Sequence, residues 1–160
     1  MNVKLSWPIF WALVGIFVVI ACEFAIPVFR DLLRGSLLFL SPFVVFFLLG
    51  VALIILTVKE KVGGMLKKFL LLTGASAAGF LFFILLHNAV YGLFIHFFGA
   101  DFWGRMGLPD EPVFFIMAIF VCPLGFLVGT AGSIALDIKK FRQQNRPAGK
   151  ATPGESAPRP

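Results

Sequence analysis

Four long uncharged stretches divide the chain. They cover residues 5–22, 35–58, 69–100 and 112–136, and they are 18, 24, 32 and 25 residues long. An α-helix rises about 1.5 Å per residue, so about 20 apolar residues cross the roughly 30 Å of hydrocarbon in a bilayer. Each stretch meets or nearly meets that length, and the first continues past Glu23 as an apolar run to Phe29. The pattern therefore predicts four transmembrane helices.

The stretches are apolar on every side rather than alternating. A transmembrane β-strand alternates lipid-facing and lumen-facing residues, whereas residues 43–49 are apolar throughout. We therefore expect an all-α polytopic membrane protein, a four-transmembrane-helix antiparallel bundle over residues 1–141. The third stretch is too long for one perpendicular crossing, so its helix either tilts or ends near Gly92. The expected helices cover about 6–29, 36–58, 69–92 and 113–138.

Composition agrees with this pattern. The chain has 160 residues, of which 59% are apolar and only 14% are charged, and its mean hydropathy is +0.97. Soluble domains have about a quarter of their residues charged, so a water-soluble globular domain is excluded. After Phe141 the sequence becomes polar and rich in Pro and Gly. Such a segment cannot bury apolar surface, and residues 142–160 are predicted to be a disordered basic tail.

The basic residues are distributed unequally between the two sides of the predicted bundle. Ten lie in the N-terminus, the loop after the second helix and the proximal tail, and three lie on the other side. The positive-inside rule then predicts an inner (cell) membrane protein with a cytoplasmic N-terminus and C-terminus. Anionic lipid at the cytoplasmic face is the expected partner of these charges. No folded basic face remains for nucleic acid. The ten are Lys4, Lys59, Lys61, Lys67, Lys68, Lys139, Lys140, Arg142, Arg146 and Lys150.

The first stretch has a second interpretation. Lys4, the apolar run and Cys22 resemble a bacterial lipoprotein signal, in which Cys22 would be lipidated after cleavage. Hydrophobicity resumes directly after Glu23, which favours a retained membrane helix.

Small residues predict how the helices pack. Gly125, Gly129 and Gly132 share one face of the fourth helix, and Gly74 and Ala78 have the same four-residue spacing on the third. Lipid provides little hydrophobic drive for association, so close contact through small residues replaces it. The pattern predicts a contact between helices three and four. The same motif also serves a homo-oligomer or a contact with another membrane protein, and this alternative stays open.

Glu23 is the one acidic residue well inside a predicted span. An ionisable group at this depth is a functional-site hypothesis, because its burial is costly unless it is paired or neutralised. The structural alternative is that Glu23 bonds a neighbouring helix or reaches Arg30. Pro27, Pro42 and Pro123 would each free a backbone carbonyl in the outer half of a helix. These freed groups predict a kinked, partly hydrated outer cavity.

Three further polar residues lie near the outer end of the third helix. His87, Asn88 and Tyr91 complete, with Glu23, a candidate intramembrane polar site. His87 and Tyr91 share a helix face. The alternative is that these side chains mark the water boundary, where amphipathic residues gather.

The sequence offers no pattern for catalysis or metal binding. A metal site could be drawn from Cys22, Glu23, His87 and Cys122, but these residues lack the local ligand spacing of zinc or iron–sulfur sites. No serine elbow, P-loop or His-Glu metal motif is found. We expect no metal, no cofactor and no enzymatic activity.

Several segments carry a family resemblance. They are residues 59–64 (KEKVGG), 69–80 (FLLLTGASAAGF), 86–92 (LHNAVYG) and 99–103 (GADFW). Together they resemble a group of small uncharacterised prokaryotic integral membrane proteins over roughly residues 36–140. That group has no established activity, so the resemblance implies a four-helix fold and no site. A weaker likeness links the chain to small multidrug-resistance transporters, which also have four helices and one Glu in the first.

Two functional hypotheses follow. The first is a small membrane protein with a structural or accessory role, packing against itself or a partner. The alternative is a proton-coupled transporter or channel subunit in which Glu23 exchanges a proton or cation.

Overall fold

The computed structural model describes residues 5–28, 36–108 and 111–145. These residues form helices and turns, and no strand occurs among them. Four helical segments are long and apolar enough to cross a membrane. The structure thus confirms an all-α fold with four spanning segments. They are Ser6–Ala25, Leu38–Lys59, Gly64–Phe98 and Pro112–Gln143.

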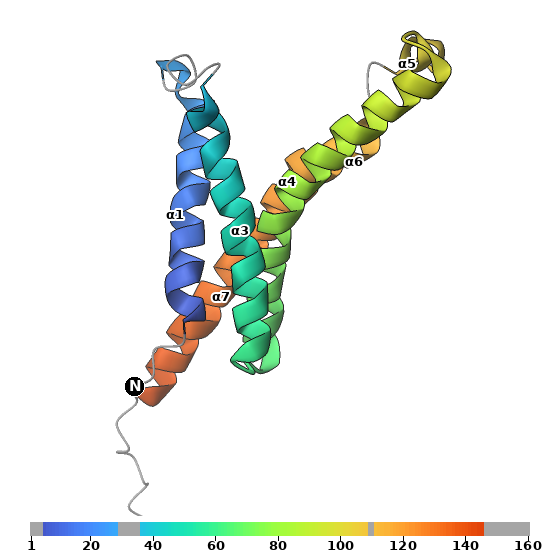
Figure 1. Cartoon of the computed structure of the whole chain (residues 1–160). Helices are drawn as coiled ribbons and strands as arrows, with labels where there is room; N and C mark the ends of the chain where they lie inside the picture. Colours follow the sequence, from blue (N-terminus) through green and yellow to red (C-terminus); the bar gives the residue numbers. More distant parts are fainter. Residues whose placement is uncertain (1–4, 29–35, 109–110, 146–160) are drawn as a thin grey trace, which may run out of the picture.

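Successive segments run in opposite directions (Figure 1). The first three are single helices, α1 (Ser6–Ala25), α3 (Leu37–Lys59) and α4 (Gly64–Phe98). The fourth consists of α6 (Pro112–Ile116), the π-helix η1 (Met117–Val121) and α7 (Cys122–Gln144). A short helix, α5 (Phe102–Arg105), lies between α4 and α6.

The helices form an open row rather than a closed ring. The extensive contacts are those of α1 with α3, α3 with α4, and α4 with α7. Figure 1 shows α1 and α3 as one arm and α4 with α6 as the other, and the two arms diverge toward the end that carries α5. The molecule therefore has a seam between α1 and the fourth segment.

The first helix is shorter than expected. It ends at Ala25 instead of Phe29, which itself lies outside the described residues. Ile26 is extended, with φ −106° and ψ 107°. The ring of a proline disfavours helical backbone at the residue before it, so Pro27 breaks the helix rather than kinking it.

The helices of the third and fourth membrane segments, α4 and α7, are longer than expected. Helix α4 continues through Gly92 to Phe98 and begins at Gly64, five residues before the predicted start. It ends at Gly99, whose φ of +92° favours glycine. Helix α7 runs to Gln144, so the first residues of the predicted tail are helical. The rest of that tail, residues 146–160, lies outside the described residues.

Two prolines inside the spans are accommodated locally. In α3, the hydroxyl of Ser41 donates to the carbonyl of Leu38 at 2.8 Å, and this is the carbonyl that Pro42 leaves without its helical donor. Before Pro123 the chain forms the π-helix η1, in which the Cys122 N–H bonds the carbonyl of Met117 five residues back. A hydroxyl thus compensates for Pro42, and a change of helical register precedes Pro123.

The glycine stripe of α7 lies directly against α4. A Cβ added to Gly129 would come 2.5 Å from Thr73 Oγ1 and 2.8 Å from its backbone nitrogen. A Cβ on Gly125 would come 2.5 Å from Ser76 Oγ, and one on Gly132 would overlap the ring of Phe69. The absence of side chains at these three positions of α7 therefore allows its backbone to lie close to α4.

Gly74 and Ala78 belong to a different interface from the one expected. A Cβ on Gly74 would lie 2.9 Å from the carbonyl oxygen of Gly50, and one on Gly50 would lie 2.8 Å from the backbone nitrogen of Ala78. Both residues thus face α3. The expectation that Gly74 and Ala78 pack against α7 is wrong. They pack against α3, where Gly50 is the small residue that permits the close approach.

Candidate functional site: dispersed polar residues and an apolar cavity

Glu23 lies near the outer end of α1 and is 4% exposed. It shares the buried face of that helix with Leu13 and Ile20. Its Oε2 atom is buried and has no hydrogen-bond partner among the described residues. Next to it, the ring of Phe24 meets that of Phe43 from α3 at 6.1 Å. The carboxyl is therefore buried directly beside a residue that makes an aromatic contact with α3.

His87 is held by Glu111, the residue directly before the fourth segment. Its Nδ1 lies 3.0 Å from the backbone carbonyl oxygen of Glu111 and 3.3 Å from Glu111 Oε2. A carbonyl oxygen can only accept, so Nδ1 carries the hydrogen in this arrangement. The contact joins the outer half of α4 to the beginning of α6.

Glu111 is a buried polar residue that was not among the predicted site residues. Its carboxylate accepts from the backbone N–H of Val113 at 2.8 Å and of Phe114 at 3.0 Å, and the residue is 5% exposed. It therefore caps α6. The signal was present in the sequence, because an acidic residue before a proline is a common helix start.

Asn88 and Tyr91 have unrelated surroundings. Asn88 is exposed, and its Nδ2 donates to the carbonyl of Ile84 in its own helix at 2.8 Å. Tyr91 stacks on Trp103 of α5, with ring centres 5.9 Å apart and planes 9° apart. The indole Nε1 of Trp103 also donates to the Tyr91 carbonyl at 3.4 Å. Tyr91 therefore anchors α5 to the end of α4.

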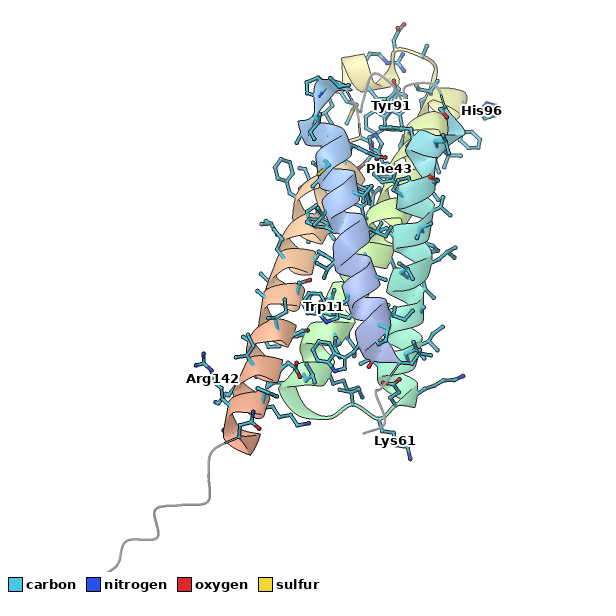
Figure 2. All side chains as sticks on the ribbon, turned by 90° about the vertical axis from the view of Figure 1, so that its left-hand side faces the viewer. Trp11, Phe43, Lys61, Tyr91, His96 and Arg142 are labelled. Carbon is cyan, nitrogen blue, oxygen red and sulfur yellow. The ribbon has the colours of Figure 1, made fainter. Side chains whose placement is uncertain are left out.

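The four predicted site residues do not form one cluster. Glu23 is buried without a hydrogen-bond partner for its Oε2, His87 contacts the residue that caps α6, Asn88 is exposed, and Tyr91 contacts α5. Figure 2 shows Tyr91 at the end of the bundle opposite Lys61, and His96 pointing outward from the same end. The sequence pattern predicts similar depths in the membrane for these four residues, but their side chains have different surroundings.

A cavity of about 260 Å³ lies between α1 and the fourth segment. Helices α1, α3, α4, η1 and α7 all contribute to it. Its lining is almost entirely carbon, with Ser76 and Cys122 as the only side chains that carry a polar or sulfur atom. The lining residues are Phe17, Ile20, Ala21, Phe24, Phe46, Ser76, Phe80, Ile119, Cys122, Pro123 and Phe126.

Three phenylalanines close the cavity toward the end of the bundle that carries the turn between α3 and α4. Phe17 stacks on Phe126 with centroids 4.6 Å apart, and Phe46 lies 5.2 Å from Phe126. Phe126 is only 1% exposed. These rings come from α1, α3 and α7, so they join α1 to the fourth segment at this level of the bundle. The cavity lies on the side of these rings that faces Phe24.

The cavity differs from the hydrated one that the sequence predicted. Glu23 is not among its lining residues, although Ile20, Ala21 and Phe24 of the same helix are. The helical positions explain this, since Glu23 projects from α1 at a different angle from Ile20, Ala21 and Phe24. At Pro42, moreover, the Leu38 carbonyl accepts from Ser41 and is therefore not left free.

The cysteines and acidic residues are dispersed. Cys22 is exposed on α1, whereas Cys122 is buried against the cavity. Within residues 5–28, 36–108 and 111–145, no group of three or more His, Cys, Asp and Glu side chains is placed to hold a metal ion.

The four apolar helices and the buried aromatic seam are those of a small multi-pass membrane protein. Comparison of the chain with protein-family models, with curated proteins and with solved structures found no match.

Proposed function

We propose that this chain is a structural or accessory component of a prokaryotic inner membrane, with its N-terminus and C-terminus in the cytoplasm. The observation that carries the orientation is the collection of basic side chains at one end of the bundle. Figure 2 has Lys61 and Arg142 at that end and Tyr91 and His96 at the other. This separation supports a cytoplasmic position for the turn between α3 and α4 and for the end of α7.

The orientation is tested by labelling single cysteines in intact cells. In a chain whose Cys22 and Cys122 are replaced by Ala, Cys is introduced at exposed Lys61 or at exposed Asp101. We expect a membrane-impermeant maleimide to label the Asp101→Cys variant in intact cells and the Lys61→Cys variant only after lysis. The reverse pattern would overturn the proposed topology.

An accessory role is supported by the packing of the bundle. Its interior is filled by glycine contacts and phenylalanine rings, and its long helices present large apolar side chains outward. Crosslinking in native membranes followed by copurification tests this role. We expect a second copy or a defined partner to copurify, with Lys→Gln at exposed Lys140 as a neutral control. Recovery of the chain alone, across crosslinkers of different length, would contradict it.

Proton-coupled transport is the second candidate, and the unpartnered Oε2 of buried Glu23 favours it. It predicts that Glu23→Gln abolishes a pH-dependent flux across liposomes, whereas Asp101→Asn on the exposed outer loop retains it. An equal flux in both variants, or none with the unchanged protein, would reject this role for Glu23.

A further inference from the structure

We propose that the cavity between α1 and the fourth segment holds one acyl chain of a bilayer phospholipid. The proposal goes beyond the accessory role and depends only on the chain's being embedded in a membrane. Every residue that lines the cavity belongs to one of the four segments suited to crossing a bilayer. The surrounding solvent at that depth is hydrocarbon, and lipid tails compete for any space that opens sideways.

The lining suits an alkyl chain and not water. A buried water needs two to four polar partners. The cavity offers the hydroxyl of Ser76 and the thiol of Cys122, and all its other side chains end in carbon. Ser76 Oγ also lies against the backbone of Gly125 in α7. An alkyl chain would gain dispersion contacts with the phenylalanine rings without leaving polar atoms unpaired.

The volume distinguishes an alkyl chain from larger occupants. An engineered apolar cavity of about 150 Å³ stays dry and binds benzene, and this cavity measures about 260 Å³. It therefore accepts more than one ring-sized group. A helix from a second copy is about 10–12 Å across with its side chains, which is too wide for a space of this volume. One flexible unbranched chain matches it.

The cavity opens sideways to the membrane. Phe24 and Ile119 line it, yet they are 57% and 39% exposed, and exposed Ala21 contributes only a methyl group between them. Helices α1 and α7 lack an extensive backbone contact in the described chain. A lipid tail can thus reach the interior between Ala21 and Ile119 while its headgroup stays at the outer surface.

The test uses the full chain in nanodiscs made with a phosphatidylethanolamine that carries a diazirine in the middle of one acyl chain. After irradiation, peptide mass spectrometry locates the label. We expect label on Phe80 and Cys122, which are 8% and 5% exposed and so lie out of reach of bulk lipid. Label on exposed side chains such as Leu48 reports bulk lipid in the same sample.

Two matched variants on α1 make the test specific. Ala21→Trp fills the mouth, and Ala12→Trp places the same ring at an exposed position outside the lining. We expect Ala21→Trp to lose the label on Phe80 and Cys122 and to keep that on Leu48, with Ala12→Trp unchanged. Two results would overturn the proposal: no label on Phe80 and Cys122 in the unchanged protein, or label retained on them in the Ala21→Trp variant.

Two further measurements cover the remaining outcomes. If Ala21→Trp does not fold, Ile119→Ala widens the mouth instead and must increase the label on Cys122; an unchanged label overturns the proposal. Rapid reaction of Cys122 with a water-soluble maleimide in nanodiscs would show a hydrated cavity and also overturn it. A loss of topology or copurification leaves these lipid labels unaffected, so the accessory role and the lipid site fail independently.

Discussion

The carboxylate of Glu60 accepts two hydrogen bonds from Ser6, one from the backbone N–H at 3.1 Å and one from the hydroxyl at 2.7 Å. Ser6 begins α1 and Glu60 follows the last residue of α3. The end of one helix thus provides the carboxylate that satisfies the start of another, where unpaired N–H groups and the helix dipole favour negative charge.

This pair can be measured by a double-mutant cycle. We expect Ser6→Ala and Glu60→Gln each to reduce the free energy of unfolding in detergent, with a coupling of about 1 kcal/mol, because both disturb the charge-assisted bond from the Ser6 hydroxyl to the Glu60 carboxylate. Lys61→Gln, at the exposed neighbouring position, is the control and should change little. Strictly additive losses would show that Ser6 and Glu60 act separately.

Gly129 tests the contact of α7 with α4. We expect Gly129→Ala to destabilise the protein by about 1–3 kcal/mol, because its methyl group would meet the backbone and hydroxyl of Thr73. Gly92→Ala is the matched control, since nothing lies within 4 Å of a Cβ there. Thermal unfolding in detergent should show this control unchanged or stabilised by about 0.5–1 kcal/mol through helix propensity. Equal effects at both positions would contradict the close approach.

Glu23 provides a test of what its buried carboxyl does for stability. We expect Glu23→Leu to raise the free energy of unfolding by about 1–3 kcal/mol, because a buried oxygen without a partner is removed. Glu23→Gln keeps a polar group of the same shape and should change stability less. A loss of stability in Glu23→Leu would mean that the carboxyl makes a needed contact.

Glu111 should matter more than other acidic residues of the outer loop. Glu111→Ala removes the side chain that caps α6 and contacts His87, and we expect a loss of about 1–2 kcal/mol. Asp101→Ala is the control, because Asp101 precedes α5 without a side-chain cap bond. Thermal unfolding of both variants decides the matter, and similar losses would argue against a special role for Glu111.

The sequence predicted the spans well and the interfaces less well. The spans follow from uncharged length, because backbone groups in lipid must bond within their own helix. The glycine stripe at 125, 129 and 132 was recognisable from its spacing. Its partner surface was not, since spacing alone cannot say that Gly50 of α3 takes the face of α4 that carries Gly74.

The candidate polar site failed for a related reason. Depth in a span can be counted from the sequence, but the direction of Glu23 or His87 around its helix depends on which neighbours arrive there. The predicted hydrated outer cavity depended on carbonyls that prolines free. One of these is satisfied locally, because Ser41 next to Pro42 donates to the Leu38 carbonyl, and the cavity that is present has an apolar lining without Glu23.

The stacked rings of Phe17 and Phe126 have a consequence for how the protein is made. They are separated by more than one hundred residues, so α1 is fastened by a part of the bundle that is synthesised well after it. Until then α1 has only α3 as a close neighbour. Closure across so long an intervening segment is entropically slow. We therefore expect α1 to reach its final packing only after the fourth segment has been inserted.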